Sequence, residues 1–267
     1  MLYTVLSNAP VFILVFARCI ALILTAPLFS SRAIPRTAIA AFALLASFIM
    51  LRTAEDAGFS AAYGQLAVFT LPYLLTLAGE ALIGIIMGFY VSIIFSAFST
   101  AGQFFSFQTG LGASEVYDAL AQVSNPILGQ YLNLMAMLLF LTAGGFQELF
   151  LSGLLRSYQS INAASLAASR DVFYRFLLSG LTDLFFDAFM IALPVSGVLF
   201  LVSISMGLLT KAAPQMNLLS EGLPLTILVS FFVIAHVLPA MCYFFNDLFT
   251  QGLRNVERLF ISVSGGI

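Results

Sequence analysis

Residues 81–114 read ALIGIIMGFYVSIIFSAFSTAGQFFSFQTGLGAS, a run of 34 residues without Asp, Glu, Lys or Arg. A run this apolar is typical of a chain that lies in a membrane. As one helix it would be about 50 Å long, whereas the hydrocarbon core of a bilayer is about 30 Å thick. The excess length predicts that the helix breaks, and Ser99–Gly102, which is rich in small and polar residues, is the expected place.

The composition of the whole chain supports a membrane location. The 267 residues are 61% hydrophobic and 8% charged, whereas soluble domains are about 45–50% apolar and about 25% charged. A backbone in lipid must satisfy its own hydrogen bonds, and these runs lack the alternation of barrel strands. The sequence therefore predicts a single all-α polytopic domain over residues 1–267. Six hydrophobic elements are expected, at 9–31, 37–51, 66–99, 126–151, 183–209 and 223–250.

Two features bear on topology. The second element has only 15 residues between Arg36 and Arg52, or about 22 Å of helix, which predicts a half-hairpin packed inside protein. If each element crosses once, one side carries Arg52, Arg156, Arg170, Arg175, Arg254 and Arg258, and the other carries Arg32, Arg36 and Lys211. The positive-inside rule then places both termini in the cytoplasm.

No basic residue precedes Arg18, so the first element is not expected to be a cleaved signal peptide.

The segment after the expected break is a candidate gate. It combines glutamines, phenylalanines and glycines that suit a lipid-facing helix poorly. Irregular backbone at membrane depth persists only inside protein or beside water, so a re-entrant or pore-lining segment is one interpretation, and an interfacial loop with Phe anchors is the other. The candidate gate residues are Gln103, Phe104, Phe105, Phe107, Gln108, Gly110 and Gly112.

A ridge of small residues precedes this segment. Residues four apart share one face of a helix, and small side chains let the backbone of a second helix come close. The candidate helix-packing ridge consists of Glu80, Gly84, Gly88, Ser92 and Ser96. Five positions in register predict tight packing against a partner helix.

Four charged residues lie within otherwise apolar surroundings: Arg18, Glu80, Asp183 and Asp187. An acidic residue at the bilayer centre costs about 3 kcal/mol, so Glu80 must face protein or water. It belongs either to a pathway for an ion or polypeptide or to a buried contact with Arg18. The two aspartates, four residues apart, would share a helical face as a proton relay or, as we expect, mark a helix start after Ser179.

No catalytic, cofactor or metal site is expected. His236 is the only histidine and has no neighbouring ligand. Gly79 and Gly84 have the spacing of a phosphate loop, but the Lys and the Ser or Thr that such a loop requires are absent. The net charge of −2 predicts no nucleic-acid partner. Cys19 and Cys242 lie in apolar segments and are expected to be buried thiols.

Between the fifth and sixth elements the chain reads GLLTKAAPQMNL (207–218) and then GLPLT (222–226). This pattern resembles the FliR family of flagellar export-gate proteins, whose injectisome relatives are the SctT proteins. Arg18 with Pro27, the ridge, and Gly102-Gln103 before Gln108 and Gly110 extend the resemblance over most of the chain. The residues of the family signature are Pro214, Gln215, Met216, Asn217, Gly222 and Pro224.

The resemblance implies a subunit of the type III export gate, which forms the pore for secretion of unfolded flagellar or virulence proteins across the bacterial inner membrane. It implies FliP-like and FliQ-like partners, FlhB-like and FlhA-like export proteins, and a place in the flagellar basal body. It also implies tilted, broken helical hairpins and a loop over about 103–125 that plugs the closed pore. The alternative is a secondary transporter or channel for a small solute or ion, motivated by the buried charges.

Overall fold

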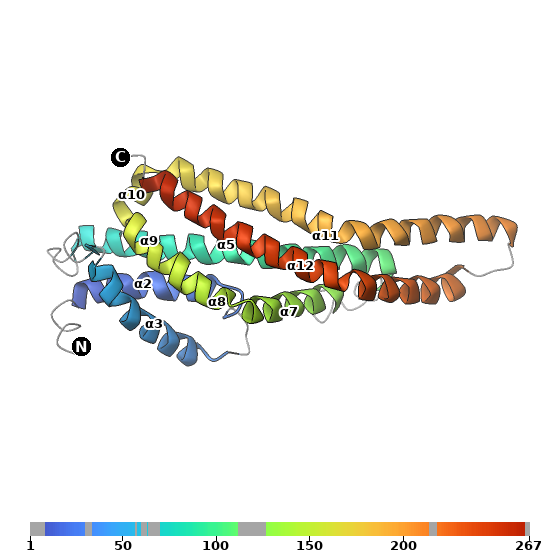
Figure 1. The fold of residues 1–267 in the computed structure, drawn as a ribbon, viewed down its shortest axis with the longest axis horizontal. Helices are drawn as coiled ribbons and strands as arrows, with labels where there is room; N and C mark the ends of the chain where they lie inside the picture. Colours follow the sequence, from blue (N-terminus) through green and yellow to red (C-terminus); the bar gives the residue numbers. More distant parts are fainter. Residues whose placement is uncertain are drawn as a thin grey trace. The chain divides into compact units, whose positions relative to one another are not determined.

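The structure, a computed structural model, describes residues 9–29, 34–56, 58–59, 63, 70–111, 127–213 and 218–264. These residues form helices and turns without any strand, which confirms the predicted all-α class. The helices in chain order, labelled as in Figure 1, are α2 (Ala9–Thr25), α3 (Arg36–Asp56), α5 (Leu71–Thr109), α7 (Ile127–Thr142), α8 (Gly145–Glu148), the π-helix η2 (Leu149–Leu154), α9 (Leu155–Ser160), α10 (Ala163–Ala168), α11 (Arg170–Ala212), the π-helix η3 (Leu218–Gly222) and α12 (Leu223–Ser264).

Four of the described helices are long and apolar enough to cross a membrane, namely α3, α5, α11 and α12. The count becomes five if α7 and the segment Gly145–Ser160 together form one broken span. Helix α2 is apolar but has only 17 residues, fewer than the roughly 20 that a crossing needs. The protein is therefore a polytopic membrane protein, as the sequence predicted.

The chain divides into two compact units, the first built from three separate stretches and the second from two. The first contains 1–93, 144–181 and 249–267, and the second contains 94–143 and 182–248. Three of the four boundaries fall within α5, α11 and α12, and the fourth lies between Ala143 and Gly144, in the turn between α7 and α8.

In the first unit, α2 packs against both α3 and the early part of α5. Four members of the ridge face α2: Glu80, Gly84, Gly88 and Ser92. A Cβ atom at Gly84 would overlap the backbone oxygen of Arg18, and one at Gly88 would lie 2.7 Å from the backbone oxygen of Leu22. The Ser92 hydroxyl donates to the backbone oxygen of Thr25 at 2.7 Å. The two backbones approach closely because the ridge lacks bulk there. The fifth member, Ser96, is an exposed residue of the second unit.

The second unit has an aromatic core. Phe95 packs edge-on against Phe140 of α7 and Phe245 of α12, with ring centroids 5.4 and 5.8 Å apart, and Phe98 packs on Phe245 at 4.9 Å. Gly102 lies against Gly129 of α7, where a Cβ would come within 2.8 Å of the backbone carbon of Leu128.

This close contact explains why the predicted break at Ser99–Gly102 is wrong. Helix α5 runs unbroken through these residues to Thr109 and has 39 residues. Its small residues accommodate α7 instead of interrupting the backbone. Its excess length is tolerated because residues such as Phe98, Ala101 and Phe105 are fully buried in protein. Length relative to the bilayer therefore did not require a break.

Two other sequence-based expectations need correction. The second element was expected to be too short to cross, but α3 continues through Arg52 to Asp56 and reaches 21 residues, with charges near both ends. Asp183 and Asp187 do not start a helix, because α11 begins at Arg170 and both lie in its interior. A helix can carry carboxylates in its middle when their side chains reach a surface, and Asp183 is exposed while Asp187 is half-buried.

Replacing ridge glycines by alanine should distinguish two effects on stability: the loss of close helix packing and the gain in helix propensity. We expect Gly84→Ala and Gly88→Ala to lower the free energy of unfolding by about 1–3 kcal/mol, because the added methyl overpacks the contact with α2. Gly207→Ala in α11 is the matched control, since nothing lies within 4 Å of its Cβ position. There the change should stabilise the chain by up to about 1 kcal/mol. Thermal unfolding of the purified chain in detergent measures all three, and equal effects at the three sites would contradict the packing role.

Candidate functional site

The most polar feature of the first unit is a buried ion pair between α2 and α5. The side chains of Arg18 and Glu80 are both 0% exposed. Arg18 Nε donates to Glu80 Oε2 at 2.7 Å, and Arg18 Nη2 contacts the same oxygen. Burial of an ion pair is tolerated only with such direct pairing, because each charge loses its hydration. The pairing is one of the two roles that the sequence left open for Glu80.

The remaining polar atoms of the pair hold the connection between α9 and α10. Arg18 Nη1 donates to the Ser157 hydroxyl at 2.9 Å, and Nη2 also donates to the backbone oxygen of Ile161 at 3.0 Å. The second carboxylate oxygen of Glu80 accepts from the backbone N–H of Ala163 at 3.1 Å. The ion pair thus joins three segments that are far apart in the sequence.

Aromatic rings close the cluster against solvent. The guanidinium carbon of Arg18 lies 4.3 Å from the ring centroid of Tyr158 and 5.7 Å from that of Phe59. Both distances allow a cation–π interaction, which gains strength when the cation is desolvated. The Tyr158 hydroxyl donates to the backbone oxygen of Val15 at 3.1 Å and so fixes its ring on α2.

Sequence reasoning missed most of the partners in this cluster. Ile161 and Ala163 contribute backbone atoms, so their side chains give no signal. Ser157 and Tyr158 are ordinary residues of an apolar segment. Their one sequence signal was indirect: a buried arginine needs more acceptors than a single carboxylate offers.

The two aspartates are not part of this cluster. Within the described residues, neither Asp183 nor Asp187 has an ion-pair or hydrogen-bond partner. The described part of the chain also places no three His, Cys, Asp or Glu side chains together in a way that could hold a metal ion.

The candidate gate residues lie on the last two turns of α5 and just beyond, not in a loop. Residues 103–109 are helical, and Gly110 ends the helix with φ at +80°, a conformation that favours glycine. Phe104 and Phe107 are exposed on one face, whereas Phe105 is fully buried. Gly112 lies outside the described residues.

The end of α5 meets the start of α12 in the second unit. The Cβ position of Gly110 is 3.4 Å from Leu223 Cδ2. A small hollow of about 270 Å³ lies here, lined by Gln108 and Thr109 of α5, Ser203 and Met206 of α11, and Gly222 and Thr226 near the start of α12. The structure thus brings Gln108 and Gly110 of the candidate gate beside Gly222 of the family signature. Pro224 is exposed in the first turn of α12, and Pro214, Gln215, Met216 and Asn217 lie outside the described residues.

Comparison with known proteins adds independent information. The sequence profile of the family described as "Bacterial export proteins, family 1" matches residues 9–252. The chain is 29% identical to the flagellar biosynthetic protein FliR of Bacillus subtilis (strain 168), over 96% of each chain. It is also 29% identical to FliR of Escherichia coli (strain K12), over 88% of this chain and 86% of the relative. The surface presentation of antigens protein SpaR of Shigella flexneri is 31% identical over 58% of this chain and 59% of its own.

The buried pair predicts asymmetric mutational effects. Glu80→Gln should lower the free energy of unfolding by about 3–5 kcal/mol, because it leaves a buried arginine without its counter-charge. The double variant Arg18→Met with Glu80→Leu should recover most of that loss, since it removes both charges and their desolvation cost.

Arg156 and Glu257, an exposed ion pair of the same unit, provide the control. Glu257→Gln should cost less than about 1 kcal/mol. Thermal unfolding in detergent gives all three values. A double variant less stable than Glu80→Gln would show that the pair stabilises the fold beyond the neutralisation of its charges.

Proposed function

Since the chain belongs to family 1 of the bacterial export proteins, we propose that it is a membrane subunit of the type III protein export apparatus that secretes flagellar proteins. The match over residues 9–252 is the observation that supports this proposal most strongly. The FliR proteins of Bacillus subtilis and Escherichia coli align over a larger share of the chain than SpaR does, which favours the flagellar over the injectisome system. No observation favours a solute transporter.

The surface of α11 suits an assembly of several subunits. Large apolar side chains are exposed along it, among them Phe185, Phe186, Phe189, Phe200 and Leu201. At 43 residues the helix is about 64 Å long, so a bilayer alone cannot cover its whole apolar surface. Helices of FliP-like and FliQ-like subunits would cover the remainder. FlhB-like and FlhA-like export proteins are the further partners we propose.

Within this assembly, the end of α5 is the proposed gate. Phe104 and Phe107 form an exposed apolar face that would exclude water and ions from a closed pore. Gly110 has a positive φ, so the chain can turn directly after this face, and Gly110 packs against Leu223. Contact with Leu223, which lies between the signature residues Gly222 and Pro224, would couple the gate to the start of α12.

The proposed location is the bacterial inner membrane, within the flagellar basal body. Six of the nine basic residues used to orient the elements fall on the side of the C-terminus, which supports a cytoplasmic position for that end. Fusion of alkaline phosphatase or of a fluorescent protein after Ile267 tests this orientation. Phosphatase activity without fluorescence would reverse it.

Co-expression tests the proposed function directly. With FliP-like and FliQ-like subunits from the same bacterium, the chain should purify in detergent as a stable complex, because its exposed apolar faces require partner helices. Deletion of its gene should abolish both secretion of flagellar proteins and motility. A chain that always purifies alone, in a bacterium that stays motile without it, would contradict the proposal.

The gate can be tested without disturbing the fold. Phe107→Ala removes an exposed side chain, so the complex should still assemble, but ion conductance across planar bilayers should rise because the apolar barrier is thinner. Phe200→Ala, an equally exposed phenylalanine of α11, is the matched control and should leave conductance unchanged. Unchanged conductance with an intact Phe107→Ala complex would remove Phe107 from the gate.

A further inference from the structure

Helices α11 and α12 each contain a proline in their interior, Pro194 and Pro239. Proline has no backbone N–H, so each one removes the hydrogen bond to the backbone oxygen four residues earlier, that of Met190 or of Ala235. Both prolines are exposed, so neither is needed to fill the core of the second unit. Interior prolines are common sites at which a long helix bends.

The two prolines lie at nearly the same height in the helix pair. The hollow at the end of α5 shows how the two helices align, because Ser203 of α11 and Thr226 of α12 both line it. Pro194 is nine residues before Ser203, and Pro239 is 13 residues after Thr226. In a helix these separations are about 14 and about 20 Å, so they differ by about one turn. Both helices therefore lose a backbone hydrogen bond near one level and can bend there together.

Burial changes at the same level. On one side of the prolines, residues 182–193 and 240–248 pack into the second unit, and seven of these 21 residues are buried, including Phe245 of the aromatic core. On the other side lie two helical stretches, residues 195–213 and 220–238, which together we call the arm. Six of these 38 residues are buried. A segment with fewer buried contacts is easier to displace, so the arm is the part that we expect to move.

The arm carries the contact with the proposed gate. The Cβ position of Gly110 is 3.4 Å from Leu223 Cδ2, and the hollow of about 270 Å³ leaves this contact incompletely packed. Ser106 lies one turn before Gly110 on the same face of α5. It is 1% exposed, and its hydroxyl has no hydrogen-bond partner among the described residues. A buried hydroxyl without a partner is unfavourable, so hydration of Ser106 would offset part of the packing lost when the arm moves away.

From these observations we infer that the arm pivots about Pro194 and Pro239, and that this movement opens and closes the gate at the end of α5. Leu223 is 16 residues from Pro239, or about 24 Å of helix, so a rotation of about 10° moves it by about 4 Å. Added to the present 3.4 Å, this displacement exceeds about 4.5 Å, the limit of contact between apolar atoms. A small bend therefore releases Gly110. The role in gating rests on the proposed function, whereas the pivot is a property of the chain itself.

Distances between spin labels test the pivot in the purified full chain, held in lipid nanodiscs with both native cysteines replaced by alanine. One label is placed at Tyr131 of α7 and the other at Leu208 of the arm, both exposed residues of the second unit. Met190, exposed on α11 before the proline, replaces Leu208 in the matched control. Double electron–electron resonance should give a distance distribution about 4 Å broader at Leu208, because it lies 14 residues beyond Pro194.

The double variant Pro194→Ala with Pro239→Ala restores both backbone N–H groups, so each helix must break a hydrogen bond before it can bend. The distribution at Leu208 should then narrow to the width found at Met190. Equal widths at the two positions in the unaltered chain, or an unchanged width at Leu208 in the double variant, overturns the inference.

Secretion tests the consequence for the gate. Each restored hydrogen bond should lower the population of the bent helix, and with it secretion of flagellar proteins by the cells, by about two- to tenfold. The complex with FliP-like and FliQ-like subunits should still assemble. Pro72→Ala is the matched control and should leave secretion unaltered, because Pro72 is exposed in the first turn of α5, where a backbone N–H has no acceptor within the helix. Normal secretion in both Pro194→Ala and Pro239→Ala, or an equal loss in Pro72→Ala, overturns the link between the arm and the gate.

These measurements separate the inference from the proposed function. If the label distances show no pivot while deletion of the gene abolishes secretion, the inference fails and the proposed function stands. If the pivot is present but the bacterium secretes flagellar proteins without this chain, the proposed function fails together with the gating role of the arm.

Discussion

The ion pair between Arg18 and Glu80 is the interaction on which the first unit depends. Neither charge could remain alone in an apolar interior, so each must be met by the other and by further hydrogen-bonding groups. Those groups come from Ser157, Ile161 and Ala163. Meeting this single electrostatic requirement positions α2, α5 and the connection between α9 and α10 together. One arginine thereby organises contacts over 62 to 143 residues of sequence.

Close backbone packing is the second constraint, and it accounts for the length of the helices. The small residues of α5 serve two different neighbours, α2 at Gly84 and Gly88 and α7 at Gly102. In a bilayer the hydrophobic effect does not drive helices together, so van der Waals contact at small residues replaces it. A helix packed in this way can exceed the thickness of the membrane, because protein covers the part that lipid cannot.

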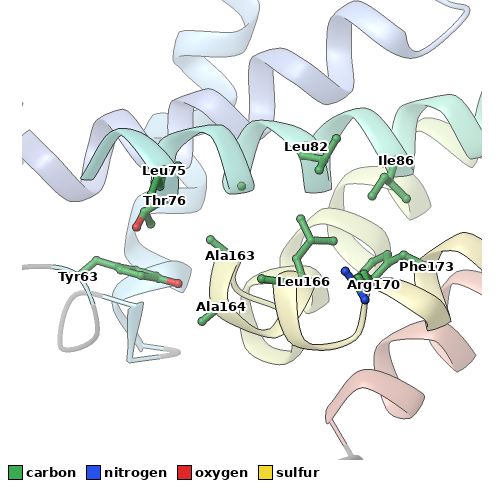
Figure 2. A pocket seen from close by; sticks show the side chains of 12 residues that line it. Tyr63, Leu75, Thr76, Leu82, Ile86, Ala163, Ala164, Leu166, Arg170 and Phe173 are labelled. Atoms are coloured by element: carbon green, nitrogen blue, oxygen red, sulfur yellow. The ribbon is translucent and has the colours of Figure 1, made fainter. Parts of the chain in front are cut away.

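These constraints connect the fold with export. Large apolar side chains are exposed along α11, and an apolar groove lies beside Tyr63 (Figure 2). The ion pair contributes indirectly by fixing Ala163 at the base of the groove. Near the end of α5, Phe105 is buried within the second unit while Phe104 and Phe107 are exposed on another face.

The sequence by itself determined the all-α membrane class, the approximate places of six apolar elements and the family. Apolar runs and a rare motif are properties of consecutive residues, so they can be recognised without knowledge of tertiary contacts. The sequence also showed that Arg18 and Glu80 each required a partner, and that the ridge would meet another helix. Only the tertiary structure decided that these requirements meet in one cluster, that Gly102 marks a contact and not a break, and that Asp183 and Asp187 lie within a helix. The physical reason is that a glycine or a charge in an apolar run has the same local pattern whether it ends a helix or faces a neighbour. The difference lies in atoms distant in sequence, such as the backbone of Gly129 or the N–H of Ala163, which leave no trace in the residues beside it.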